Sequence, residues 1–356
     1  MKNQLVALFA GVAVSAVIAS TAQAEMTNAN PGKEVEASRD LALGEELSKR
    51  TVKPVAPITM DDATRDFSTE DPAALKEGFG VITRSFGDGS ETKTPASEEM
   101  RGLIDDLLGA KPEDGAVDSS ADDEGADANR QVFGDDDRVQ ITETQKYPFR
   151  TIGQLWTQLE DGNWGSCSAT LIGAQTILTA AHCIYSHDGG GWGTKAEFYP
   201  GLNGSDAPFG GFEVVNASIL EGFVSKYKDN YGSVVPYDLA VLELDQAAGD
   251  DLGWMSIASF DKPAAFTANI VGYPGDKPDS TMWRASCEVD KSMFDENNFA
   301  YLCDTYPGSS GSSVYQYNKD KKERLILGVN IAENSQFNIA TRLNKAYFKW
   351  VADLIK

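Results

Sequence analysis

The sequence predicts an all-β fold, a sandwich or a barrel, for the part of the chain between residues 147 and 342. Short β-branched and aromatic runs recur there, separated by Gly, Pro, Asn and Asp, which is the pattern of many short strands joined by turns. The expected strands are 151–159, 168–172, 176–180, 212–220, 239–244, 270–272, 299–304, 313–317 and 325–331. Residues 344–356 carry apolar side chains at helical spacing, which predicts a C-terminal amphipathic helix.

The composition is that of a soluble globular protein, with 41% hydrophobic and 24% charged residues in a chain of 356. The formal net charge is −23. Because nucleic-acid binding needs clustered Lys and Arg, this charge argues against a nucleic-acid partner, and it argues equally against an anionic membrane surface.

The first residues predict export. Lys2 precedes an apolar run at residues 5–18, and the small-residue triplet Ala22-Gln23-Ala24 follows, which together are typical of a secretory signal peptide cleaved after Ala24. A membrane anchor is the alternative, but the run is shorter than the roughly 20 apolar residues of a helical span. We therefore expect a signal peptide at 1–24 and a secreted protein, extracellular or periplasmic.

Four cysteines, Cys167, Cys183, Cys287 and Cys303, suggest disulfides in an exported chain, and three pairings are open. Pairing of neighbours would close two loops worth about 3 kcal/mol each. A metal site is the competing interpretation, but the chain has no Cys-x-x-Cys pair and only two histidines. We expect no metal and no cofactor. Calcium stays open, since carboxylates are plentiful although no ligand loop has the required spacing.

Residues 25–130 differ from the rest of the chain. They are rich in Asp, Glu, Ala, Gly, Ser and Thr and contain no Trp, Tyr or Cys. Two short helices are expected, one from Asp71-Pro72 to Lys76 and one at 97–108. The rest is expected to be largely irregular, and the charge-rich stretch 113–127 to be disordered.

Two motifs carry a histidine and a carboxylate in suitable settings. His182 follows the apolar run 176–178 and two alanines, beside Cys183, and its ordinary pKa near 6.5 suits proton transfer at neutral pH. Asp238 stands at the head of the apolar strand 239–244, where a buried carboxylate can orient an imidazole. The common alternatives are a histidine in a polar niche and a turn aspartate. His187 lies in a Gly-rich loop and is expected at the surface.

A third motif, Pro307-Gly308-Ser309-Ser310-Gly311, lies between two expected strands. A flexible linker would have this composition, but linkers are not normally embedded between strands. A tight loop of this kind presents a hydroxyl nucleophile with backbone N–H groups directed at the developing oxyanion. Ser310 is the candidate nucleophile, and the N–H groups of Gly308 and Ser310 are the candidate oxyanion hole.

The order His, Asp, Ser with wide spacing, in an exported β-rich chain, predicts a catalytic triad of His182, Asp238 and Ser310. An esterase of the α/β-hydrolase type would place the acid and the histidine after the serine. Both histidines here precede Ser310, so the esterase interpretation fails.

These motifs resemble the trypsin- and chymotrypsin-like serine proteases, and within them the bacterial glutamyl endopeptidases. The matching stretches are 137–142 with 147–148, 179–183, 237–244, 272–277 and 304–314. The resemblance implies two antiparallel β-barrels, one at 132–248 with His182 and Asp238 and one at 249–356 with Ser310 and the C-terminal helix. It also implies a Cys167–Cys183 disulfide. The resemblance leaves out residues 25–131, which we expect to be an acidic propeptide removed near Arg130 to Val132, because a secreted protease has to be kept inactive before export. A retained linker or accessory tail is the alternative for this region.

Two departures concern activation and specificity. Ser309 stands where trypsin-like zymogens carry an aspartate before the nucleophile, and glutamyl endopeptidases lack that aspartate too. Thr305 matches their specificity threonine, but Asn330 stands where they use a histidine. Asp304 has the offset from Ser310 that gives trypsin its preference for Lys and Arg. Cleavage after Glu or Asp is the first expectation, with basic or broad specificity as alternatives.

The resemblance implies a monomeric serine endopeptidase that acts on protein or peptide substrates and binds its own propeptide. The alternative function is not enzymatic: a catalytically silent binding protein on the same fold. A complete triad in the sequence favours the enzyme.

Overall fold

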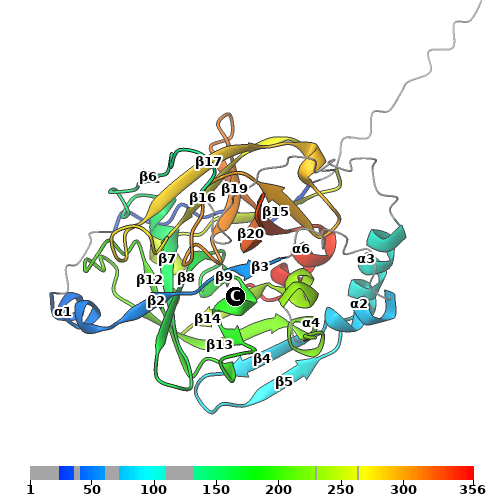
Figure 1. Cartoon of the computed structure of the whole chain (residues 1–356), viewed down its shortest axis with the longest axis horizontal. Helices are drawn as coiled ribbons and strands as arrows, with labels where there is room; N and C mark the ends of the chain where they lie inside the picture. The colour runs from blue at the N-terminus through cyan, green and yellow to red at the C-terminus, as the bar shows by residue number, and fades with distance from the viewer. Residues whose placement is uncertain (1–23, 36–40, 61–71, 110–131, 229–230, 263) are drawn as a thin grey trace, which may run out of the picture.

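The computed structural model describes residues 24–35, 41–60, 72–109, 132–228, 231–262 and 264–356 (Figure 1). The expected signal peptide up to residue 23 and the expected disordered stretch 113–127 lie outside the described residues, as does most of the expected processing site.

One sheet closes into a six-stranded antiparallel barrel with the order β12-β7-β8-β9-β14-β13. Closure comes from β13, which pairs with β14 on one side and returns to β12 at Phe212 and Phe198 on the other. The barrel strands are β7 (Ile152–Gln158), β8 (Trp164–Leu171), β9 (Thr176–Thr179), β12 (Lys195–Pro200), β13 (Phe212–Leu220) and β14 (Ala240–Leu244).

The second sheet has the order β15-β20-β19-β16-β17-β6, with β21 on β20 and β18 on β21. Among the described residues no ladder joins β17 to β18, and a disulfide from Cys287 on β17 to Cys303 just after β18 links them instead. Of the two barrels that the resemblance implies, one is therefore closed by a continuous ladder. The strands are β6 (Val139–Gln140), β15 (Ser256–Phe260), β16 (Phe266–Gly272), β17 (Trp283–Val289), β18 (Asn298–Tyr301), β19 (Ser313–Asn318), β20 (Glu323–Glu333) and β21 (Asn338–Arg342).

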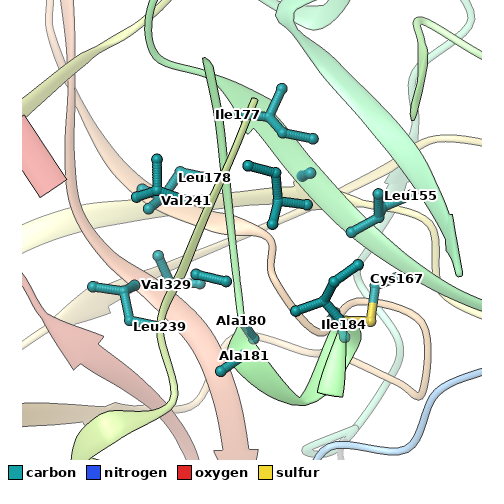
Figure 2. Packing of buried hydrophobic residues seen from close by; sticks show 14 of the residues in the cluster. Leu155, Cys167, Ile177, Leu178, Ala180, Ala181, Ile184, Leu239, Val241 and Val329 are labelled. Carbon is teal, nitrogen blue, oxygen red and sulfur yellow. A yellow bond between two sulfur atoms is a disulfide. The ribbon is translucent and has the colours of Figure 1, made fainter. Parts of the chain in front are cut away.

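Apolar side chains from both sheets meet in one core. In the close view of Figure 2, Val329 of β20 lies beside Val241 of β14 and beside Leu239, which directly precedes that strand, and Ile184 lies beside Cys167. All of these side chains are less than 5% exposed. The sheets therefore pack directly on each other rather than through a linker.

The expectation of a largely irregular N-terminal region is wrong for the described residues. The two expected helices are present as α2 (Pro72–Gly78) and α3 (Glu98–Gly109), but α1 (Leu41–Lys49) and five strands accompany them. Strand β4 pairs with the barrel strand β13 and β1 with β15, because unpaired sheet edges offer hydrogen bonds to any extended segment. These strands are β1 (Ala24–Met26), β2 (Val52–Pro54), β3 (Ile58–Thr59), β4 (Val81–Ser85) and β5 (Glu91–Thr94).

The C-terminal helix is present as α6 (Lys345–Ala352). Asn344 caps its N-terminus, because the side-chain oxygen accepts the N–H groups of Ala346 and Tyr347 at 3.0 and 3.1 Å. Every helix in the described part of the chain is too short or too polar to cross a membrane. The remaining short elements are β10 (Tyr185–Ser186), β11 (Gly191–Trp192), α4 (Glu221–Ser225), α5 (Gly249–Leu252) and the 3-10 helices η2 (Phe149–Thr151), η3 (Ala181–Cys183), η4 (Tyr231–Tyr237) and η5 (Lys291–Met293).

The Cys287–Cys303 bond should contribute measurably to stability, because it joins two strands that no ladder connects and closes a loop of sequence separation 16. We expect the Cys287→Ala, Cys303→Ala double variant to lose about 3 kcal/mol of unfolding free energy, measured by urea unfolding. The control is Leu302→Ala, since this neighbouring side chain is 50% exposed. Equal stability of the double variant and the wild type would contradict the expectation.

Candidate active site

His182 lies in η3, directly after the barrel strand β9. Ala180 and Ala181 before it are fully buried, so their small side chains let the chain turn inside the core. Cys183 after it is bonded to Cys167 of β8, which ties the turn to the neighbouring strand. The histidine itself is 8% exposed.

Asp238 is fully buried between η4 and β14 and holds the histidine at two points. Its Oδ1 accepts the backbone N–H of His182 at 2.9 Å, and its Oδ2 lies 2.6 Å from the His182 Nδ1. Because a carboxylate accepts, Nδ1 carries the proton in this pair. The Nε2 atom of the neutral ring is then left as a proton acceptor.

Ser310 lies in the loop of residues 307–312 that leads into β19. Gly308 and Gly311 have φ angles of +97° and +81°, a region that side-chain-bearing residues rarely adopt. Ser168 of β8 fixes the loop, because its N–H donates to the Ser310 carbonyl at 2.8 Å and its hydroxyl donates to the Gly308 carbonyl at 2.9 Å.

The loop and the histidine turn meet where the two sheets touch. A Cβ on Gly311 would overlap the hydroxyl of Thr179 and come within 3.2 Å of the Ala180 nitrogen, so only glycine permits this approach. The Nε2 of His182 and the Oγ of Ser310 are both buried, and neither has a hydrogen-bond partner among the described residues. A proton acceptor and a hydroxyl are thus brought to one junction without competing partners.

The candidate oxyanion donor Gly308 already has a partner within the chain. Its N–H donates to the carbonyl of Val55 at 2.9 Å. The donor therefore faces a position where a carbonyl oxygen can lie, and a segment of the N-terminal region occupies that position.

Asn330, a candidate specificity residue, braces the nucleophile loop. Its Nδ2 donates to the Ser309 carbonyl at 3.1 Å, and its Oδ1 accepts the hydroxyl of Tyr301. Burial raises the pKa of the Tyr301 phenol well above its ordinary value, so the phenol stays a donor. Asn330 also accepts the Gly311 N–H through its carbonyl at 2.8 Å. Both ends of its amide are used inside the protein.

Asp304 and Thr305 are buried at 4% and 3% exposure. The Asp304 carboxylate accepts the backbone N–H groups of Phe133 and Asp137 at 2.8 and 3.3 Å. Burial raises the pKa of this carboxyl, although the two N–H groups oppose the shift. The carboxylate therefore binds the start of the β-rich domain in this state.

His187, which is expected at the surface, is only partly exposed. Its ring is partly buried, stacks on Tyr227 at 3.8 Å, and its Nε2 lies 2.8 Å from the Phe223 carbonyl. Burial lowers its pKa. Three aromatic side chains around it, which the sequence places on separate segments, explain the difference: Tyr185, Phe223 and Tyr227.

Among the described residues, one group of potential metal ligands falls at this site, formed by Cys167, His182 and Cys183. The two sulfurs are bonded to each other and are not thiolates, which metal binding requires. A single imidazole remains, and Asp238 already holds its Nδ1. The donor set does not fit a metal.

Sequence reasoning did not identify Ser168 or Tyr301 as parts of the site. Ser168 acts by a hydrogen bond to the nucleophile loop, which is more than 100 residues away in the sequence. Tyr301 acts by a hydrogen bond to Asn330. No motif marks such partners. The only signal that the sequence offered is that Ser168 directly follows Cys167, whose implied disulfide partner Cys183 is next to His182.

Comparison with known proteins identifies the class. Residues 167–321 match the family described as trypsin-like peptidase domain. A glutamyl endopeptidase of Bacillus licheniformis is 26% identical over 317 residues, covering 86% of this chain and 90% of that protein. A protein of Bacillus subtilis named extracellular metalloprotease is 27% identical, covering 61% of this chain and 67% of its own length.

The solved structures agree. A structure described as Glu endopeptidase in complex with MPD aligns with a TM-score of 0.54 and 28% identity, covering 63% of this chain and 98% of that one. The sequence match at residues 167–321 contains the junction described above, with His182, Asp238 and Ser310, and it identifies this part of the chain as a trypsin-like peptidase domain.

Proposed function

We propose that this chain is a secreted serine endopeptidase whose triad is His182, Asp238 and Ser310. The observation that carries the proposal is the 2.6 Å contact between the His182 Nδ1 and the fully buried Asp238 carboxylate. A buried, oriented imidazole beside a glycine-rich serine loop is the arrangement that activates a hydroxyl.

The reaction proceeds through an acyl-enzyme. The Ser310 Oγ bonds to the substrate carbonyl carbon while its proton passes to the His182 Nε2, and the N–H groups of Gly308 and Ser310 stabilise the oxyanion. Nε2 then protonates the leaving amine as the C–N bond breaks. Water repeats the cycle, which releases the acid and restores Ser310. Asp238 stays ionised and stabilises the imidazolium.

The preference before the scissile bond is proposed to be Glu or Asp. Thr305 supports it, and a relative named glutamyl endopeptidase supports it. Basic specificity would need a free carboxylate at Asp304, but backbone N–H groups of Phe133 and Asp137 occupy that carboxylate. Asn330 does not serve as the partner for an acidic substrate side chain, since both ends of its amide are engaged.

The domain boundaries of the proposal are a signal peptide at 1–24, a propeptide at 25–131, a domain at 132–248 and a domain at 249–356. Two disulfides support export, because such bonds persist in oxidising compartments. The name of the Bacillus subtilis relative, extracellular metalloprotease, also supports export.

The Ser310→Ala variant tests the nucleophile. We expect hydrolysis of casein by the processed enzyme to fall about a millionfold and labelling by a fluorophosphonate to disappear, because the attacking oxygen is gone. Ser313→Ala is the matched control, since it removes another buried serine hydroxyl from the strand that follows. Hydrolysis at the wild-type rate in Ser310→Ala would end the proposal.

The Asp238→Asn variant tests the orienting carboxylate. The amide oxygen can still accept the His182 backbone N–H, but the imidazole loses the acceptor that fixes its tautomer. We expect kcat to fall by about four orders of magnitude with an unchanged thermal unfolding temperature. A fall of less than about tenfold would show that the carboxylate has no catalytic part.

A peptide library tests specificity. We expect cuts by the processed wild type to follow Glu or Asp, and Thr305→Val to lower kcat/KM for Glu substrates by about tenfold to a hundredfold, because a buried carboxylate would lose a hydroxyl partner. An apolar substrate residue should be cut equally by both. Cuts mainly after Lys or Arg would replace the proposed preference by the basic one.

A further inference from the structure

One short stretch of the N-terminal region crosses from one sheet to the other at the active site. We call residues 52–60 the bridging segment. Its β2 lies parallel to β8 of the barrel, with Pro54 opposite Ser166, and its β3 lies parallel to β20 of the second sheet, with Ile58 opposite Ala332. In Figure 1 the two blue strands β2 and β3 follow one another through the middle of the molecule, past the green strands and on towards β20.

Between its two strands the bridging segment accepts a hydrogen bond from the N–H of Gly308, the candidate oxyanion donor. Val55 donates its N–H to the Ser166 carbonyl and accepts the Gly308 N–H, both at 2.9 Å. Pro54 packs on the glycines beside it: a Cβ on Gly275 would overlap the proline ring, and one on Gly308 would lie 3.3 Å from its Cβ. The Ser310 side chain is fully buried in this state.

The segment is held at both ends. Arg50, just before it, pairs with Glu197, and its guanidinium lies 5.0 Å above the Trp164 ring. At the other end the side chains of Ile58 and Met60 are 4% and 5% exposed, and the Met60 N–H donates to the Glu333 carbonyl at 2.9 Å. Proline at 54 and 57 favours the extended backbone that the segment adopts.

The direction of the chain is what distinguishes this segment from a substrate. Thr305, the proposed specificity residue, lies just before the nucleophile loop, and Asn330 on β20 stands at the position where the resembling family carries its specificity histidine. A cleavable substrate therefore presents the residues before its scissile bond on the β20 side. In the bridging segment, the residues before Val55 lie on β8 and those after it lie on β20. The segment therefore runs backwards.

Reversal leaves the backbone hydrogen bonds of the segment intact but prevents cleavage of its peptide bond. Strand pairing works in either direction, so the segment satisfies the backbone groups of the site. The amine that would leave from Val55, the nitrogen of Ala56, points along the chain towards β20, whereas His182 follows β9 of the barrel. The general acid that must protonate the leaving amine thus stands on the opposite side.

We propose that residues 52–60 are a built-in inhibitor that fills the peptide-binding site backwards, with the Val55 carbonyl on the Gly308 N–H. This inference rests on the proposed peptidase function and names the segment whose departure opens the site. Activity then requires that the segment leave β8 and β20.

The test compares full-length chains in their reaction with a fluorophosphonate, a probe that reports an accessible Ser310. The Ile58→Asn variant places an unpartnered amide in a buried position, whereas the matched Thr59→Asn variant places it in the next, exposed position. Because the labelling rate follows the fraction of chains with an open site, we expect at least about a tenfold increase in Ile58→Asn and none in Thr59→Asn. Met60→Asn is a second opening variant should the first fail to fold.

Mass spectrometry of the wild-type chain tests the direction, since a reversed segment should stay uncut between Val55 and Ala56. A cut there would overturn the reversal. Equal labelling of the wild type and both opening variants would overturn the inhibitor while leaving the serine chemistry intact. Absence of labelling in every chain, the processed enzyme included, would overturn the proposed function and the inhibitor with it.

Discussion

The hydrogen bonds of Ser168 are the constraint on which the site depends. This buried residue of the barrel binds the carbonyls of Gly308 and Ser310 and accepts the N–H of Tyr273 at 2.9 Å. It thereby fixes the nucleophile loop of one sheet to the strand of the other. Two sheets that packed through apolar contacts alone could slide, because apolar contacts have little directional preference. A set of directed bonds at the junction sets the position of Ser310 relative to the histidine turn.

The same loop offers a hydrogen-bond donor to the inhibitor segment that we propose. The Gly308 N–H is the candidate donor to an oxyanion, and leaving a buried N–H without an acceptor costs about 1–3 kcal/mol. The Val55 carbonyl satisfies Gly308. In the proposed zymogen, the N-terminal region thus supplies the partner that a substrate would supply to the processed enzyme.

Two of the candidate specificity residues use their polar groups inside the protein. The Asn330 amide is hydrogen-bonded to Ser309 and Tyr301. The Asp304 carboxylate accepts the backbone N–H groups of Phe133 and Asp137. Each of these bonds braces the loop or the start of the β-rich domain. Position in the sequence suggested a role for both residues in recognising the substrate, but a side chain that holds the scaffold is not free to bind a ligand as well.

The sequence by itself determined the features that depend on local pattern: most strands of the β-rich domain, the C-terminal helix, and the three motifs around His182, Asp238 and Ser310. Tertiary structure decided the rest. Cysteine spacing left three pairings open and the family resemblance implied Cys167–Cys183, and the structure pairs Cys167 with Cys183 and Cys287 with Cys303. The N-terminal region read as largely irregular because strands such as β2 and β3 have weak patterns of their own. They form because β8 and β20 offer them hydrogen bonds, and such partners lie far away in sequence, where no local pattern can reveal them.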